Sequence, residues 1–211
     1  MLEKHFLDDQ AQMHTHLPSD APPVGLLLAA GFSRRFGAQN KLLQPLPNGE
    51  CMAVVAARSL ITALPHSVAV IRANVPELSA ALKALGLIVV ECGEQEQVMA
   101  DSLKLGLNTV LTAFPQYAGV VIALADMPFI QPQTIQHVAN ALAQHPLAQP
   151  VMAGKAGHPV GFSRALIPEL IRVEGDQGAR EVVRAHQGQS IHIACEDPGI
   201  FRDIDTPADL K

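Results

Sequence analysis

Apolar residues in this chain gather into short runs that are separated by polar, glycine-rich or proline-rich segments. Two of these runs, residues 24–30 (VGLLLAA) and 119–125 (GVVIALA), are apolar throughout and have the length of a strand. A strand that is apolar on both faces belongs inside a parallel sheet covered by helices. Two further strands are predicted over residues 66–72 and 87–91.

Segments with helical character alternate with these strands. Helices are predicted over residues 51–64, 75–85 and 131–144, and another should open at 99–107. Asn74 is the candidate N-cap of the second helix. This alternation predicts an α/β fold with a mostly parallel sheet built from right-handed βαβ units. Ligands in such sheets bind at the carboxyl ends of the strands.

Composition narrows the class of protein. The chain has 211 residues, 48% of them hydrophobic, and a net charge of −5, which is typical of a soluble protein with one sizeable α/β core. Mild acidity gives no long-range attraction for nucleic acid, so we expect no nucleic-acid partner. No apolar segment approaches the length of a membrane span, so we also expect no membrane partner. Three widely spaced cysteines fit neither a disulfide framework nor a metal site, and a cytoplasmic location is expected.

The first 23 residues differ from the rest of the chain. They are polar and lack the basic start and apolar core of a signal peptide. His14 and His16 within them are interpreted as solvated rather than metal-binding. The domain organisation predicted is therefore a flexible N-terminal extension over residues 1–23 and a single domain over residues 24–211.

The segment after the first strand carries the clearest chemistry. Its polar residues are a serine, two adjacent arginines and a lysine, set among glycines: Gly31, Ser33, Arg34, Arg35, Gly37 and Lys41. Backbone N–H groups of such a loop can contact phosphate oxygens while the cations neutralise their charge. The spacing is neither that of a P-loop nor that of a dinucleotide-binding loop. The alternative is a surface turn with solvated arginines.

A carboxylate, Asp126, stands at the end of the apolar run 119–125. A buried carboxylate is costly unless it is paired or bound to a cation. Mg²⁺ is the natural cation where a triphosphate is handled, because it combines one or two carboxylates with phosphate oxygens and water. The alternative is that Asp126 caps the helix that begins near Pro132. Asp203 and Asp205 near the C-terminus alternate on an extended stretch, so only one of them can face the metal, and we favour Asp203.

Six strings in this chain occur in the order of a known family. They are L-A-A-G-x-S-x-R-x-G-x-x-x-K from Leu28 to Lys41, M-x-x-S-L-x-x-G-L from Met99, L-A-D-M-P around Asp126, G-H-P-V-x-F followed by G-D-x-G-A-R between residues 157 and 180, and D-I-D-T-P-x-D-L from Asp203. Together they resemble the molybdenum cofactor cytidylyltransferases of the MobA-like nucleotidyltransferases. The chain departs at Val98, where a glycine of that family would stand, and this bears on how closely the preceding loop approaches the nucleotide.

The resemblance implies a single Rossmann-like, three-layer nucleotidyltransferase domain. The implied reaction is Mg²⁺-dependent transfer of CMP from CTP to the phosphate of molybdenum-molybdopterin, which gives molybdopterin cytosine dinucleotide and pyrophosphate. A molybdoenzyme or its maturation chaperone would be the protein partner. Family members with L-A-A-G tend to use CTP, whereas the guanylyltransferase branch has L-A-G-G, so Ala30 favours CTP.

The resemblance also implies roles for particular residues. Lys41 would act at the α-phosphate and Arg35 on the outgoing β- and γ-phosphates, and Asp126 would complete the catalytic group while holding the metal with Asp203 or Asp205. The expected nucleotide-binding residues are Leu28, Ala29, Ala30, Gly31, Ser33, Arg34, Arg35, Lys41, Ser102 and Asp126. The expected acceptor-binding residues are His158, Asp176 and Arg180.

Several of these residues also have structural interpretations. Ser102 could be a helix cap, His158 a histidine bonded to a carbonyl, and Asp176 part of a turn or a clasp with Arg180. At the level of function, two alternatives stay open. One is the same transfer to another phosphate acceptor or from GTP, and the other is a noncatalytic nucleotide-binding chaperone.

Overall fold

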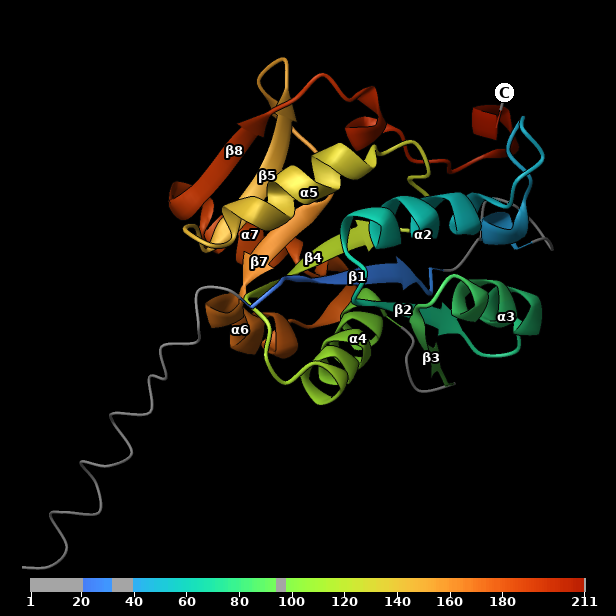
Figure 1. Ribbon diagram of the computed structural model, residues 1–211, viewed down its shortest axis with the longest axis horizontal. Coiled ribbons are helices and arrows are strands. Elements are labelled where there is room, and N and C mark those ends of the chain that lie inside the picture. Colours follow the sequence, from blue (N-terminus) through green and yellow to red (C-terminus); the bar gives the residue numbers. More distant parts are fainter. Residues whose placement is uncertain (1–20, 32–39, 94–97, 211) are drawn as a thin grey trace, which may run out of the picture.

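Strand β1 (Val24–Ala29) lies at the centre of the molecule in the computed structural model, which describes residues 21–31, 40–93 and 98–210 (Figure 1). It pairs in parallel with β2 (Ser67–Arg72) on one side and with β4 (Gly119–Leu124) on the other. Strand β3 (Ile88–Cys92) pairs in parallel with β2. The four strands predicted from the apolar runs therefore form one parallel half-sheet.

The remaining strands extend the sheet beyond β4. They are β5 (Leu147–Met152), β6 (Lys155–Ala156), β7 (Val160–Ser163) and β8 (Ser190–Ala194). The order is β3-β2-β1-β4-β7-β5-β6, with β8 paired to β5. β7 runs antiparallel to both β4 and β5, whereas β8 runs parallel to β5. The predicted α/β fold with a mostly parallel sheet is confirmed, and an antiparallel connection joins its two halves.

Helices cover both faces of the sheet and give three layers (Figure 1). One face carries α2 (Met52–Ala63), α3 (Pro76–Ala84) and α5 (Pro132–Ala141), and the other carries α4 (Met99–Ala113), α6 (Ile167–Arg172) and α7 (Arg180–Ala185). Side chains of β1 alternate between the two cores, because successive residues of a strand point to opposite faces. Leu27 packs in the first core and Leu26 in the second, and both are fully buried.

Helix α4 lies very close to the sheet. At Gly106 a side chain would begin 2.6 Å from Leu26 Cδ1 and 2.7 Å from Val70 Cγ2, so glycine permits this contact. The close packing brings the first turn of α4 beside the carboxyl ends of β1 and β2. These are the strand ends at which the α/β pattern predicts a ligand site.

The helix predictions hold in extent but not in every cap. Helix α3 has Val75 at its N-cap position, so the prediction that Asn74 caps it is wrong. Asn74 instead has a φ of 65°, and asparagine is among the residues that tolerate this left-handed conformation. Gly86, with a φ of 95°, follows the end of the same helix.

Two further points concern the chain ends and membranes. The predicted extension falls almost entirely on residues 1–20, which lie outside the described residues, so its flexibility stays a prediction. Within the described part of the chain, no helix is long and apolar enough to cross a membrane.

Candidate active site

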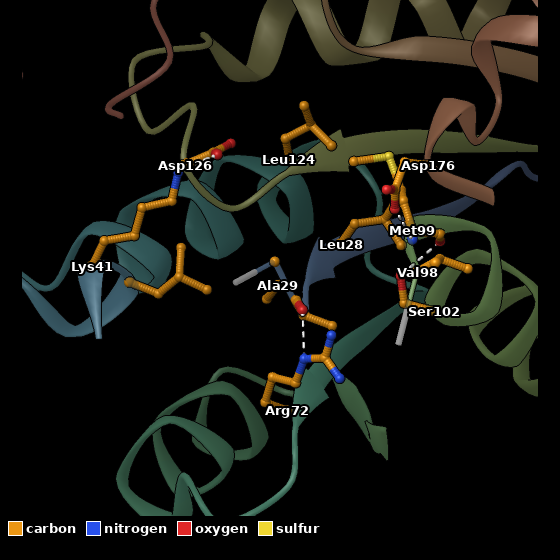
Figure 2. A pocket seen from close by; sticks show the side chains of 13 residues that line it. Leu28, Ala29, Lys41, Arg72, Val98, Met99, Ser102, Leu124, Asp126 and Asp176 are labelled. Atoms are coloured by element: carbon orange, nitrogen blue, oxygen red, sulfur yellow. Dashed lines mark hydrogen bonds and ion pairs between the residues drawn. The ribbon is translucent and has the colours of Figure 1, made fainter. Parts of the chain in front are cut away.

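A cavity of about 180 Å³ lies at the carboxyl ends of β1, β2 and β4 (Figure 2). It is lined by Leu28, Ala29, Ala30, Gly31, Lys41, Leu42, Arg72, Val98, Met99, Ser102, Leu124, Asp126 and Asp176. We call it the nucleotide pocket. It brings together every described member of the predicted nucleotide-binding set, whereas Ser33, Arg34 and Arg35 lie outside the described residues.

Lys41 is the most tightly held charge of this pocket. Its Nζ donates to Asp126 Oδ2 at 2.8 Å, to Asp205 Oδ1 at 3.1 Å and to the backbone carbonyl of Ile204 at 3.2 Å. The residue is 8% exposed, and it opens a 3₁₀ turn, η2 (Lys41–Leu43), where the Asn40 side chain accepts from Leu42 N–H at 3.0 Å. Two carboxylates from distant parts of the chain thus converge on one ammonium group, and Figure 2 shows the Lys41 side chain reaching Asp126.

The pKa of Lys41 follows from this arrangement. Burial of the ammonium group by itself lowers the pKa, but the hydrogen bonds and negative charges of Asp126 and Asp205 outweigh that effect. The pKa of Lys41 is therefore raised above its ordinary value, and the side chain is a cation at neutral pH. Its charge is available to a phosphate in a partly desolvated setting.

The C-terminal segment delivers Asp205 to the pocket. Ile204 N–H donates to the backbone carbonyl of Asp126 at 2.9 Å, and Asp205 follows directly. Asp203 is exposed, whereas Asp205 pairs with Lys41 beside Asp126, so the structure favours Asp205 as the second carboxylate of the candidate metal site, and the preference for Asp203 as the residue that faces the metal stays untested. Residues two apart on an extended strand share a face, so alternation alone does not separate Asp203 from Asp205. The two residues differ in the structure because Asp205 pairs with Lys41 whereas Asp203 is exposed.

The same segment is anchored by a buried carboxylate that sequence reasoning missed. Asp197 is 2% exposed, and its carboxylate accepts from Gln131 N–H at 2.9 Å, Thr134 Oγ1 at 2.7 Å and Gly199 N–H at 2.9 Å. Asp197 thus bonds to the first turn of α5, where the alternative interpretation had placed Asp126. Asp126 is consequently not the cap of this helix, and no local pattern in the sequence marks Asp197 for this contact.

The pair Asp126 and Asp205 has the chemistry of a partial metal site. Within residues 21–31, 40–93 and 98–210, no group of three or more histidine, cysteine, aspartate or glutamate side chains comes together to hold a metal ion. Two carboxylates that share one cation, here the Lys41 ammonium, nonetheless suit Mg²⁺, because this ion takes one or two protein carboxylates and fills its shell with phosphate oxygens and water.

Opposite the end of β1 stands the first turn of α4. Ser102, predicted to contact base or ribose, is buried in this turn and its hydroxyl donates to the Met99 carbonyl at 2.9 Å. The residue before this turn is Val98, and its backbone N–H donates to the Asp101 carboxylate at 3.2 Å. Ser102 is therefore not the cap of the helix, and its oxygen still lines the pocket.

Arg72 is a further pocket residue that the sequence analysis did not single out. It ends β2, and its Nε–H donates to the carbonyl of Ala30 at 2.8 Å (Figure 2). The signal was available, since a charged side chain at the carboxyl end of an apolar strand is the same pattern that identified Asp126.

A second cavity of about 280 Å³ adjoins the first, and we call it the acceptor pocket. Its polar lining is Gln149, His158, Gln177, Arg180 and Arg184, and its apolar lining includes Leu103, Ile122, Val160 and Val183. Leu28, Met99 and Leu124 line both cavities and form the wall between them. The structure thus brings together His158 and Arg180, two of the three residues predicted to bind the acceptor.

His158 carries an unsatisfied group. Its Nδ1 atom is buried and has no hydrogen-bond partner among the described residues, and its backbone N–H donates to Ile200 O. Burial lowers the pKa of the imidazole, the charge of Arg180 lowers it further, and Asp126 and Asp203 act in the opposite direction. The net effect is a pKa below the ordinary value, so the ring is neutral at pH 7.

Asp176, the third predicted acceptor residue, lies on the nucleotide side of the wall. Its carboxylate accepts a long hydrogen bond of 3.4 Å from Met99 N–H, and within the described chain it forms no ion pair with Arg180. Gly178, with a φ of 53°, packs so closely against Met99 that a side chain there would begin 3.0 Å from its sulfur. The segment 175–178 therefore packs against Met99 in the wall, and it does not form the clasp with Arg180 that was the alternative interpretation of Asp176.

Comparisons with known proteins identify the family to which this chain belongs. The chain matches a family described as MobA-like NTP transferase domain over residues 25–190. It is 29% identical over 196 residues to the purine catabolism protein PucB of Bacillus subtilis, covering 87% of this chain and 92% of PucB. A crystal structure of Rv0371c from Mycobacterium tuberculosis superposes with a TM-score of 0.77 at 26% identity, covering 90% of this chain and 95% of that one. A manganese complex of Rv0371c superposes with a TM-score of 0.71 at 25% identity, covering 89% and 95%.

Proposed function

Because this chain belongs to the MobA-like NTP transferase family and is a nucleotidyltransferase, we propose that it transfers CMP from CTP to the phosphate of molybdenum-molybdopterin. The products are molybdopterin cytosine dinucleotide and pyrophosphate. The nucleotide choice rests on the L-A-A-G string at Leu28–Gly31, and the acceptor rests on the G-H-P-V-x-F and G-D-x-G-A-R strings that resemble the cytidylyltransferases.

The reaction needs no covalent enzyme intermediate. An oxygen of the acceptor phosphate attacks the α-phosphorus of CTP, a new P–O bond forms there, and the bond to the β-phosphate oxygen breaks as pyrophosphate leaves. The acceptor phosphate is already a nucleophile, so the enzyme has to hold it in line and stabilise charge on the leaving group. The proposed residues serve these two tasks.

Lys41 is the main electrostatic group in this proposal. Its ammonium is held as a cation between Asp126 and Asp205 at one end of the nucleotide pocket. We assign it to the α-phosphate, and we assign Arg35, in the loop outside the described residues, to the β- and γ-phosphates. A preorganised donor of this kind contributes about 2–4 kcal/mol to transition-state stabilisation.

Asp126 and Asp205 are the residues that would hold Mg²⁺. When bound, this ion would screen the charge of the triphosphate and of the leaving pyrophosphate. Asp126 keeps its place through the Ile204 hydrogen bond to its backbone, independently of its side chain. The carboxylates of Asp126 and Asp205 would then interact with both Mg²⁺ and the Lys41 ammonium.

The acceptor pocket suits an anionic ligand with an apolar body. Arg180 is an exposed cation in its lining, and the apolar part of the lining includes Leu103 and Val160. Besides Arg180 and the apolar residues, we assign the neutral imidazole of His158 to contact with the acceptor. The observation that carries the proposal is that the two pockets adjoin each other and share Met99 as a lining residue. An acceptor phosphate in one pocket would therefore lie next to the α-phosphate of a nucleotide in the other.

Measurement of pyrophosphate release tests the proposal directly. The purified protein is incubated with Mg²⁺, molybdenum-molybdopterin and each of the four nucleoside triphosphates, and the dinucleotide is identified by mass spectrometry. We expect the fastest release with CTP, at least about tenfold faster than with GTP, and at least about a hundredfold slower release with the Asp126→Asn variant. Preference for GTP would overturn the cytidylyl assignment, turnover with another phosphate compound would overturn the acceptor, and CTP binding without release would favour the noncatalytic alternative.

A further inference from the structure

The contact between Arg72 and the end of β1 has no part in the proposed chemistry. Arg72 is the last residue of β2, one position beyond the point at which β1 and β2 stop pairing, where Ala29 faces Ile71. In place of a further backbone bond between the strands, the Arg72 side chain donates its Nε–H to the Ala30 carbonyl at 2.8 Å. Both residues line the nucleotide pocket.

We propose that Arg72 is a positioning residue that orients the Ala30–Gly31 peptide so that the Gly31 N–H is presented to the phosphates of the nucleotide. This inference rests on the proposed nucleotide binding. The peptide unit is planar and trans, so its carbonyl and its N–H point in opposite directions. A carbonyl fixed on Arg72 therefore turns the Gly31 N–H away from Arg72 and fixes its direction.

Gly31 is suited to such an approach. It has no φ in the left-handed region, and a side chain built on it would meet no atom of the described residues within 4 Å. Neither backbone conformation nor packing against the described chain therefore calls for glycine. Close approach of a ligand to the backbone is a remaining physical reason for glycine at this position.

The bond to Arg72 is strong enough to orient the Ala30–Gly31 peptide. A hydrogen bond from a guanidinium to a carbonyl is charge-assisted and stronger than one between neutral groups. It fixes the peptide at the junction between the strand and the loop from residue 31 onward. The strand behind it is held by Ala125 N–H, which donates to Leu28 O at 3.0 Å, so the peptide is anchored from two sides.

Binding of a nucleotide and of its nucleoside tests this role. The dissociation constants of Mg²⁺-CTP and of cytidine are measured by NMR titration for the wild type and for Arg72→Met. We expect about a tenfold weaker binding of CTP, the scale of one charge-assisted contact, and unchanged binding of cytidine, which has no phosphate. Equal weakening of both ligands, or of neither, would overturn the inference.

Two further variants separate position from charge. Arg72→Lys keeps the positive charge but loses the planar Nε donor, so we expect it to bind CTP as weakly as Arg72→Met. Full recovery with lysine would mean that charge alone acts and would contradict the positioning role. Arg58→Met is the matched control, because Arg58 pairs with Glu50 on the exposed side of α2, and it should leave both constants unchanged.

Failure of this inference differs from failure of the proposed function. A wild type that binds another nucleoside triphosphate in preference to CTP would correct the proposed substrate, and the same comparison then uses that nucleotide and its nucleoside. Melting temperatures of the variants show whether a loss of affinity reflects unfolding. A variant that melts with the wild type and loses only phosphate-dependent affinity supports the role of Arg72.

Discussion

The charged side chains of the nucleotide pocket and the His158 imidazole of the acceptor pocket differ in their hydrogen bonding. In the nucleotide pocket the Lys41 ammonium is bonded to Asp126 and Asp205, and the Arg72 guanidinium is bonded to a backbone carbonyl. In the acceptor pocket the Nδ1 atom of His158 is buried without a partner among the described residues. The nucleotide pocket lies at the parallel half of the sheet, and the acceptor pocket lies where β4 and β7 join that half to the rest.

This difference has a physical meaning. The Lys41 ammonium is oriented before a triphosphate arrives, which favours electrostatic stabilisation, although a phosphate has to displace one of its three present acceptors. A buried nitrogen without a partner costs free energy, and a ligand that supplies a hydrogen bond recovers it. In the proposed reaction the nucleotide pocket would stabilise the transition state, and the acceptor pocket would discriminate among ligands.

The largest loss of turnover is expected when the carboxylate proposed to bind Mg²⁺ is removed. We expect Asp126→Asn to lower turnover by at least about a hundredfold, because a neutral amide holds Mg²⁺ poorly. The melting temperature should change little, since the backbone contact to Ile204 remains. Steady-state pyrophosphate release is the measurement, and turnover close to the wild type would contradict the assignment.

The two C-terminal carboxylates provide the matched control for that experiment. Asp205→Asn should also lower turnover, by at least about tenfold, while the exposed Asp203→Asn should have a much smaller effect. The reverse order would restore Asp203 as the partner of Asp126.

Removal of the paired cation should come next in size. Lys41→Ala is expected to cost about 2–4 kcal/mol in transition-state stabilisation, measured as the change in kcat/KM. Its partners Asp126 and Asp205 would then repel each other, so the apparent affinity for Mg²⁺ in the absence of nucleotide should rise. If only the melting temperature changed, Lys41 would be structural.

The choice between CTP and GTP tests the shape of the nucleotide pocket at Ala30. We expect a preference for CTP over GTP of at least about tenfold in kcat/KM, because a methyl group at Ala30 narrows the slot for the base and such steric differences are worth about 1–3 kcal/mol. Ala30→Gly should relax the preference only in part, since the Met99–Ser102 turn on the other side is unchanged. Steady-state rates with both nucleotides decide this, and a wild type that prefers GTP would refute it.

The smallest expected effect concerns the acceptor pocket and pH. The pKa of His158 is lowered in the folded protein, mainly by burial, so between that value and about 6.5 the unfolded chain binds more protons than the folded one. Stability should therefore fall as pH decreases through about 6.5, by up to roughly 1 kcal/mol between pH 7.5 and 5.5.

Denaturant unfolding at the two pH values measures this effect. His158→Gln should flatten the pH dependence, and the control His137→Gln, on the exposed side of α5, should leave it as it is. An equal slope in all three proteins would mean that His158 takes up its proton in the folded state.

Much of the fold could be predicted because its signals are local. The runs at 24–30 and 119–125 became β1 and β4, since only a strand buried on both faces is apolar at successive positions. Helices α2 and α5 were also found within a few residues of their bounds. Strands β5, β6 and β8 were not predicted, because they are short or only partly buried and their patterns are weak.

From the sequence alone it was possible to predict the class of fold, a candidate site at the ends of the parallel strands, and Lys41 and Asp126 as charges of that candidate site. These follow from side-chain types and their spacing within a few residues. Only the tertiary structure decided that Asp205, rather than Asp203, joins Lys41 across 164 residues of chain, and that Arg72 holds the Ala30 carbonyl. Such contacts depend on how elements that are far apart in the sequence pack together, which no local pattern of residues records.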